Sequence, residues 1–380
     1  MFLSKKIKIF VDAHCLDTSY QGTQTFVRDL YLVLLSHYHD LDIYFGASNK
    51  ENVLKNFPFL DSNKILIYKK SIFPLQRILV DIPRILKQQH FDFAHFQNLA
   101  PLNVKGTKSI VTLHDVLYND YKEHFPFHFQ KSRSLLFGLS IKNAFIKTTV
   151  SNYSLRRIAY HYKISPKEIT IISNAVNELD CHFKTKSEAE ELIENKFGLK
   201  RFILYVSRFE PRKNHELLLD SYLEQKLYER DIHLVFIGEK SIEINSLDNK
   251  LSGLQSNIKQ YIHHFHQVDG KDLSAFYTAC SLFVYPSDAE GFGIPPLEAA
   301  ICKAPVLCSS NTAMGEFDFF APNHFQPCCK KELGIKIKGL IDNPPSVTFL
   351  NDTARAVKEK YSWQKSADTF YKILKNSMEA

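Results

Sequence analysis

The stretch between residues 285 and 298 carries the residue types that best suit the binding of a polar ligand. Two glycines, Gly291 and Gly293, lie between Glu290 and Glu298, which stand eight positions apart. Glycine lets a ligand approach the main chain closely, and carboxylates accept hydrogen bonds from hydroxyl groups. The spacing therefore indicates a ligand that presents hydroxyls near a backbone-exposed loop.

The residues around this loop predict a strand before it and a helix after it. Leu282–Tyr285 is an apolar run typical of a strand. Pro295 and Pro296 suit the first turn of a helix, where their missing N–H groups would have no partner anyway. A helix start offers free N–H groups and a positive dipole end to an anion. Because the glutamates would repel a bare phosphate, we expect a ligand with phosphate and vicinal hydroxyls, such as a nucleotide sugar.

A second strand-to-helix turn carries two cations. The apolar run at 202–206 is followed by Arg208 and Lys213, five positions apart, and then by an amphipathic helix that begins at His215. Arginine offers a bidentate fork and lysine a point charge, a combination that suits a diphosphate. We expect both side chains to converge on one anion at the carboxyl end of the strand. The alternative is an ordinary solvated basic loop.

Together the two elements resemble the signature of the retaining glycosyltransferases of family 4, which have the GT-B fold. The match consists of two glutamates with seven residues between them around a Gly-Phe-Gly-hydrophobic-Pro loop, and of an Arg-(four residues)-Lys-Asn element at 208–214. One departure is Ser207, which stands where the family usually has glycine. The alternative for the glutamates is an acidic turn before a capped helix.

The resemblance implies a role for each matching residue. Arg208 and Lys213 would stabilise the charge on the leaving diphosphate, so that no metal is needed. Glu298 would hold the ribose hydroxyls. Glu290 would hold the sugar hydroxyls together with the loop backbone, and it is the only candidate near the site for a nucleophile, so we favour front-face attack with the departing phosphate as base. The implied donor site comprises Gly22, Arg208, Lys213, Glu290, Gly291, Phe292, Gly293, Ile294 and Glu298.

Two motifs in the first half also resemble family elements. Gly22 lies in Gln21–Thr25 before an expected helix, like the glycine loop that faces donor and acceptor, although members often have two glycines. A simple turn with a threonine cap is the alternative. Val111–Asp115 places His114 at the end of an expected strand, and the resemblance implies that His114 contacts the sugar. A structural role is the alternative for His114 and the favoured one for His95.

Apolar, β-branched runs alternate with helical patterns along the whole chain, which predicts α/β units with parallel sheets. With the resemblance, this implies a GT-B fold of two Rossmann-like domains whose sheets face each other across a cleft. We expect an acceptor-side domain at 1–175, a charged linker at 176–200 and a nucleotide-sugar domain at 201–362. The family also implies that the C-terminal helix, 363–380, packs back onto the first domain.

Composition narrows the class further. The 380 residues suit two domains, and no stretch approaches 18 apolar residues. The N-terminus runs directly into an expected strand and lacks the pattern of a signal peptide. Seven cysteines, an odd count without a Cys-x-x-Cys pair, do not suggest a disulfide or zinc framework. We therefore expect a cytoplasmic protein that uses no cofactor, with the nucleotide-diphospho-sugar as its donor substrate.

Charge is unevenly distributed. Residues 1–180 hold 23 Lys and Arg against 15 Asp and Glu, whereas the remainder is nearly neutral. A basic half indicates attraction to a polyanion or an anionic membrane surface, and hence peripheral attachment to the inner face of the membrane; ordinary solubility charge is the alternative. No nucleic-acid-binding motif is evident. The expected basic patch comprises Lys69, Lys70, Arg77, Arg84 and Lys87.

The favoured interpretation is a retaining hexosyltransferase that moves a hexose to a glycan or lipid-linked acceptor in the synthesis of a cell-surface polysaccharide such as lipopolysaccharide. The Gly-Ile-Pro-Pro variant of the loop looks most like bacterial mannosyltransferases, which places GDP-mannose ahead of a UDP-hexose as donor. Two alternatives stay open: a nucleotide-sugar epimerase of the same fold, and a non-catalytic GT-B subunit that scaffolds an active partner.

Overall fold

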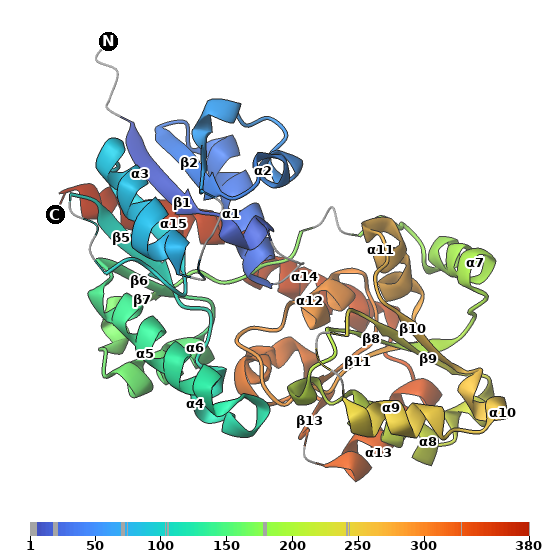
Figure 1. The fold of residues 1–380 in the computed structure, drawn as a ribbon. Coiled ribbons are helices and arrows are strands. Elements are labelled where there is room, and N and C mark those ends of the chain that lie inside the picture. The colour runs from blue at the N-terminus through green and yellow to red at the C-terminus, as the bar shows by residue number, and fades with distance from the viewer. Residues whose placement is uncertain are drawn as a thin grey trace. The chain divides into compact units, whose positions relative to one another are not determined.

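A computed structural model of the chain describes residues 6–17, 22–69, 73, 75–102, 104, 106–177, 181–240, 242, 244–327 and 329–379. Gln21 and Lys70, which the sequence analysis names, lie outside these ranges. The chain forms two compact units (Figure 1). The first comprises Met1–Asn174 with Trp363–Ala380, and the second comprises Ala175–Ser362.

The first unit is built on a parallel sheet. Its strands lie in the order β3 (Ile65–Ile67), β2 (Leu41–Ala47), β1 (Ile7–Asp12), β4 (Phe93–Gln97), β5 (Lys108–Thr112), β6 (Ile146–Thr149) and β7 (Ile169–Ile171). The central strands are almost continuously buried, as expected for a parallel sheet with helices on both faces.

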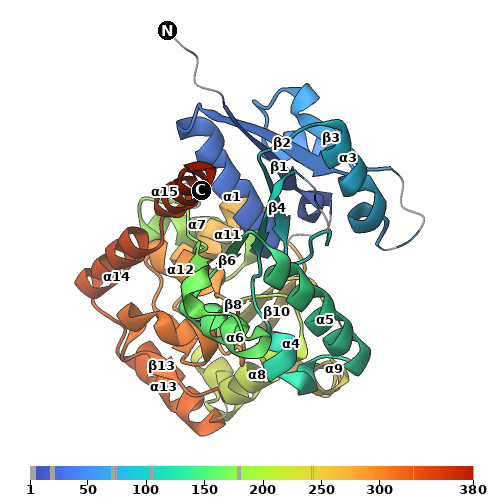
Figure 2. The same cartoon turned by 90° about the vertical axis from the view of Figure 1, so that its left-hand side faces the viewer.

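Helices cover the two faces of this sheet as separate layers (Figure 2). On one face, α1 (Gly22–His37) packs against the C-terminal helix α15 (Trp363–Glu379), where the rings of Phe26 and Trp363 lie 6.2 Å apart. The other face shares a core with η3 (Arg77–Asp81), α3 (Ile82–Gln88), α5 (Phe127–Asn143) and α6 (Asn152–Tyr162). The first unit also contains the short helices α2 (Lys50–Asn56) and α4 (Leu117–Asp120).

The second unit repeats this architecture. Its parallel sheet has the order β10 (Ile262–Phe265), β9 (His233–Ile237), β8 (Phe202–Val206), β11 (Leu282–Tyr285), β12 (Val306–Ser309) and β13 (His324–Phe325). Its helices are α7 (Lys186–Phe197), α8 (His215–Glu224), α9 (Asn245–Ser252), α10 (Ser256–Lys259), α11 (Gly270–Ala279), α12 (Ile294–Ile301), α13 (Lys330–Asp342) and α14 (Val347–Lys360). The expected α/β fold with two Rossmann-like domains is thus confirmed.

The segment 176–200, expected to be a linker, instead contains helix α7 and belongs to the second unit. Thr185 caps this helix by accepting a hydrogen bond from the backbone of Glu188. Ala189 and Ile193 are buried, and the helix packs against α11. Most of its other positions are charged and exposed, so the apolar side is too narrow to stand out in the sequence.

The expected basic patch is also altered by tertiary contacts. Arg77 forms an ion pair with Asp12, whose side chain is buried at the end of β1. Arg84 lies 3.3 Å from Asp81. Lys69 and Lys87 are exposed. The two arginines of the expected patch therefore pair with carboxylates of the same unit, whereas the described lysines stay exposed.

Among the residues described, each helix is too short or too polar to cross a lipid bilayer.

Candidate active site

The candidate site lies in the second unit, where the loops after β8 and β11 meet. These strands are neighbours in the sheet, with Ile203 opposite Leu282, although they are far apart in sequence. The sheet continues outward in opposite directions from this pair. In open α/β sheets such a switch point, at the carboxyl ends of the strands, is where ligands bind. The two motifs found in the sequence are therefore brought together by the strand order.

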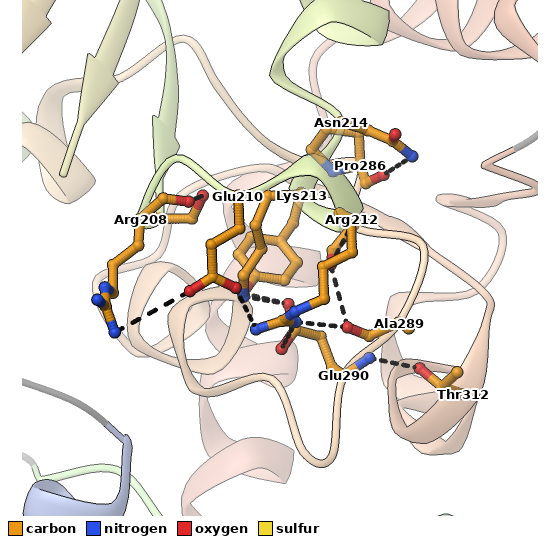
Figure 3. Close-up of polar contacts among 12 residues, drawn as sticks. Arg208, Glu210, Arg212, Lys213, Asn214, Pro286, Ala289, Glu290 and Thr312 are labelled. Atoms are coloured by element: carbon orange, nitrogen blue, oxygen red, sulfur yellow. Dashed lines mark hydrogen bonds and ion pairs between the residues drawn. The ribbon is translucent and has the colours of Figure 1, made fainter. Parts of the chain in front are cut away.

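Glu290 is the centre of a buried ionic cluster (Figure 3). Its Oε1 pairs with the ammonium of Lys213 and accepts a hydrogen bond from the Tyr285 hydroxyl at 2.9 Å. Its Oε2 lies 3.1 Å from Nη1 of Arg212. Arg212 also lies 2.8 Å from Glu210. The carboxylate of Glu290 is thus held on both oxygens.

This cluster keeps Glu290 ionised. Burial alone would raise the pKa of Glu290, but the positive charges of Lys213 and Arg212 outweigh it and lower that pKa to about 2. Burial and the nearby Arg212 lower the pKa of Lys213, yet its contact with an ionised carboxylate favours the ammonium form. At neutral pH the side chains of Glu290 and Lys213 therefore form an ion pair.

The loops that carry these residues are fastened to each other by hydrogen bonds. The side-chain amide of Asn214 donates to the Pro286 carbonyl at 3.1 Å and to Asp288 at 2.6 Å. The Asp288 N–H donates to the Arg212 carbonyl at 2.8 Å. The Glu290 N–H donates to the Thr312 hydroxyl at 2.9 Å. Such bonds hold the charged side chains in place before a ligand arrives, which is the condition for electrostatic catalysis.

The glycine loop and the start of α12 follow the sequence prediction in their local geometry. Gly293 has φ of +96°, and a Cβ there would lie 3.1 Å from Met314; both favour glycine. The side chain of Phe292 packs against Phe317 and Tyr361, so any donor contact by this residue falls to its backbone. Gly291 and Gly293 are buried, and Ile294 begins the helix.

Glu298 lies about one turn into α12, as predicted. It is half-buried, and its Oε2 accepts a hydrogen bond from the Tyr277 hydroxyl at 2.8 Å. Tyr277 belongs to α11 and is buried. Glu298 is thus oriented by a neighbouring helix, separately from the cluster around Glu290.

Arg208 and Lys213 form ion pairs with different glutamates. Lys213 is engaged by Glu290, whereas Arg208 is about one-third exposed and lies 4.0 Å from Glu210 (Figure 3). The cation that shares Glu290 with Lys213 is Arg212, to which the sequence analysis gave no role. The sequence feature that could have indicated this role is the position of Arg212 next to Lys213 in a tight turn. Neighbouring side chains in such a turn can reach a common carboxylate.

The predicted site residues of the first unit have different surroundings. Gly22 begins α1, and a Cβ there would meet no described atom within 4 Å. His114 follows β5, is half-buried, and lies 2.9 Å from Gln97; burial lowers its pKa to about 4, so it is neutral at pH 7. A contact of either residue with a donor stays a prediction. His95 is fully buried and bonded to Tyr31 and to a threonine, a structural position as expected.

Comparison with known families divides the chain at nearly the same place as the two structural units. A family model described as Glycosyltransferase Family 4 matches residues 20–178, and one described as Glycosyl transferases group 1 matches residues 187–357. The matches follow one another and leave little of the chain uncovered.

Two of the relatives are bacterial mannosyltransferases. The chain is 27% identical over 237 residues to the serotype-specific mannosyltransferase WbdA of Escherichia coli, which covers 60% of this chain and 29% of that protein. It is 26% identical over 245 residues to the O-antigen chain mannosyltransferase RfbU of Salmonella typhimurium, covering 64% of this chain and 63% of the relative. The matching part thus spans less than two thirds of either relative.

A solved structure shares the whole fold. HepE of Anabaena, solved in complex with UDP and glucose, superposes with a TM-score of 0.74 at 15% sequence identity, over 98% of this chain and all of that one. The architecture of this chain is therefore that of the GT-B fold. With both family models matched in order, the chain belongs to the glycosyltransferases that join a family 4 domain to a group 1 domain.

Proposed function

We propose that this protein is a retaining glycosyltransferase. It would move a hexose from a nucleotide-diphospho-sugar to a glycan or lipid-linked acceptor in the synthesis of a bacterial surface polysaccharide. The observation that carries the proposal is the buried cluster of Glu290, Lys213 and Arg212, which lies at the switch point of the second sheet in a chain of this family.

The cluster suits a donor that brings both charge and hydroxyls. A diphosphate would compete with Glu290 for the positive charges of Lys213 and Arg212, and Arg208, about one-third exposed, would add a third cation. Glu290, as a carboxylate, would accept hydrogen bonds from sugar hydroxyls. As the glycosidic bond breaks, negative charge grows on the diphosphate, and preorganised cations stabilise that charge.

The state of Glu290 also supports the proposed course of the reaction. A carboxylate whose pKa is lowered to about 2 by two cations is a weak base and a poor nucleophile. Double displacement would need a strong nucleophile at this position. We therefore propose front-face attack, in which the departing phosphate accepts the proton of the acceptor hydroxyl and the sugar keeps its anomeric configuration.

The donor is proposed from the relatives. One is named a serotype-specific mannosyltransferase and another an O-antigen chain mannosyltransferase, which favours GDP-mannose. A structure with UDP and glucose makes a UDP-hexose the next choice. Incubation with a panel of nucleotide sugars tests this. A transferase releases nucleoside diphosphate when an acceptor is added. Conversion of the sugar without release would indicate an epimerase, and inertness toward every donor and acceptor would favour a scaffold.

Activity should persist in excess EDTA. The proposed reason is that Arg208, Arg212 and Lys213 supply the positive charge that Mg²⁺ provides in other phosphate-transferring sites. Nucleoside diphosphate release would be measured before and after chelation, with and without added Mg²⁺ or Mn²⁺. If chelation abolishes turnover and either metal restores it, the charge stabilisation has been assigned to the wrong groups.

A further inference from the structure

The first unit contains a buried polar chain that ends at His114. His95 and Gln97 lie two positions apart on β4, so their side chains point to the same face of the sheet. Gln97 pairs with Thr112, the last residue of β5, and His114 follows Thr112 by two positions. His95 is fully buried and Gln97 is 2% exposed. Strand pairing therefore brings two imidazoles and one amide together at the ends of β4 and β5.

The Gln97 amide contacts both imidazoles. Its nitrogen lies 3.2 Å from Nε2 of His95, and its oxygen lies 2.9 Å from Nε2 of His114. An amide nitrogen can only donate a hydrogen bond, and an amide oxygen can only accept one. Nε2 of His95 must therefore accept, whereas Nε2 of His114 must carry a hydrogen and donate it.

Both histidines are neutral, so this pattern fixes their tautomers. Burial lowers the pKa of His95 to about 3 and the pKa of His114 to about 4. A neutral imidazole carries one N–H, and the partner of one ring nitrogen decides which nitrogen that is. In His95 the hydrogen lies on Nδ1, which donates to the Tyr31 hydroxyl oxygen at 2.7 Å. In His114 the hydrogen lies on Nε2, so Nδ1 is an acceptor.

Further contacts hold His114 in place and leave this acceptor unused. The His114 N–H donates to the side-chain oxygen of Asn98 at 3.1 Å, and the His114 carbonyl accepts from the Ser154 hydroxyl at 2.9 Å. The ring of Phe26 packs edge-on against the imidazole, with centroids 5.2 Å apart. Within the described part of the chain, no group forms a hydrogen bond with Nδ1 of His114. The imidazole is thus fixed with one acceptor nitrogen to offer a ligand.

We propose that Gln97 is a positioning residue, which holds His114 as the Nε2–H tautomer so that Nδ1 accepts a hydrogen bond from a hydroxyl of the bound sugar. The proposal deepens the proposed function and rests on it for the identity of the ligand. It also gives the expected contact of His114 a direction. Nδ1 can bind a hydroxyl, which has a hydrogen to donate, but not an ionised phosphate oxygen, which has none.

The burial of Gln97 supports a role beyond packing. A buried amide costs free energy unless its polar groups are paired, and an apolar side chain of the same length would avoid that cost. Both ends of this amide are paired with imidazoles. His95 is fully buried in the sheet and serves to hold the amide, and the amide in turn holds His114.

NMR of the full chain labelled with ¹⁵N-histidine tests the tautomer without any ligand. The two ring nitrogens of a neutral imidazole have different shifts when only one carries a hydrogen, and a His114→Asn variant identifies the His114 signals. We expect the Nε2–H tautomer of His114 in the parent protein. In Gln97→Met, which keeps the length of the side chain but lacks the amide, we expect a mixture of both tautomers.

Thr112→Val is the matched control. Thr112 is fully buried, and its hydroxyl lies 2.7 Å from Nε2 of His95, so the variant removes a hydrogen bond from the same chain and leaves the contacts of Gln97 in place. Both variants should lose stability. Only Gln97→Met should lower kcat/KM for the donor, by roughly tenfold, the effect of one hydrogen bond of ordinary net strength. Thr112→Val should keep the parent kcat/KM and the Nε2–H tautomer.

Three results would overturn the proposal. They are an Nδ1–H tautomer of His114 in the parent protein, an unchanged tautomer in Gln97→Met, and equal kcat/KM in Gln97→Met and Thr112→Val. The first needs no variant, so it can be read even if Gln97→Met does not fold. If the NMR results are as expected but no nucleotide sugar is turned over, the proposed function fails while the assignment of the tautomer to Gln97 stands.

Discussion

Lys213→Ala should lower turnover by roughly 10²–10³-fold, the scale for removing one preorganised electrostatic group. It should also lower the free energy of unfolding of the second unit by about 3 kcal/mol, because it leaves Glu290 buried with one of its two cations missing. Arg208→Ala should cause a similar loss of turnover with little effect on stability, since this side chain is partly exposed and its ion pair is long. Steady-state kinetics and denaturant unfolding measure the two effects.

A double variant separates catalysis from folding in this experiment. Lys213→Met combined with Glu290→Gln removes both charges, so most of the lost stability should return while turnover stays low. The affinity for nucleoside diphosphate should fall in both Lys213→Ala and Arg208→Ala. If turnover and diphosphate affinity stay unchanged in Lys213→Ala and in Arg208→Ala, the diphosphate does not bind where we propose.

The two glutamates should affect different kinetic constants. Glu298 is proposed to hold the ribose, which does not change during the reaction, so Glu298→Gln should raise the donor KM by roughly tenfold with a smaller effect on kcat. Glu290 is proposed to hold the sugar ring, whose charge and shape change as the bond breaks. Interactions that strengthen only in the transition state appear in kcat. Glu290→Gln should therefore lower kcat by roughly 10²-fold with the donor KM less affected.

Tyr277→Phe is the matched control for the Glu298 variant. It removes the hydroxyl that donates to Glu298 and keeps the carboxylate, so its KM should rise less than that of Glu298→Gln. Donor-concentration series for the three variants give both constants. The contrast is the test, because any change near a ligand can reduce activity. A reversed pattern, in which Glu290 sets KM and Glu298 sets kcat, would mean that the donor binds with its ribose at Glu290 and its sugar ring at Glu298.

The sequence by itself determined the local elements of the site. The apolar runs at 202–206 and 282–285 predicted β8 and β11, and both are observed. The prolines after the glycine loop predicted a helix start, which lies at Ile294. The sequence also predicted that Glu298 lies one turn into that helix, as observed. These features depend on neighbouring residues in the chain, on proline geometry and on apolar periodicity, so they can be predicted from local sequence.

Helix α7 is the exception among the local elements, and the reason is again physical. Of its residues only Ala189 and Ile193 are buried, so its apolar side is narrow. Its contact with α11 contributes the stabilisation that short helices cannot obtain from propensity alone. That contact belongs to the tertiary structure and leaves little trace in the local pattern.

The partners of the charged side chains were decided by the tertiary structure alone. Glu290 and Lys213 lie 77 positions apart, and they meet because β8 and β11 are neighbours in the sheet. Arg212 joins them from the same turn. In the first unit, Arg77 turns to the buried Asp12, 65 positions away. A charge within the fold must find an opposite charge to offset its desolvation, and which charge it meets depends on strand order, which local sequence does not encode.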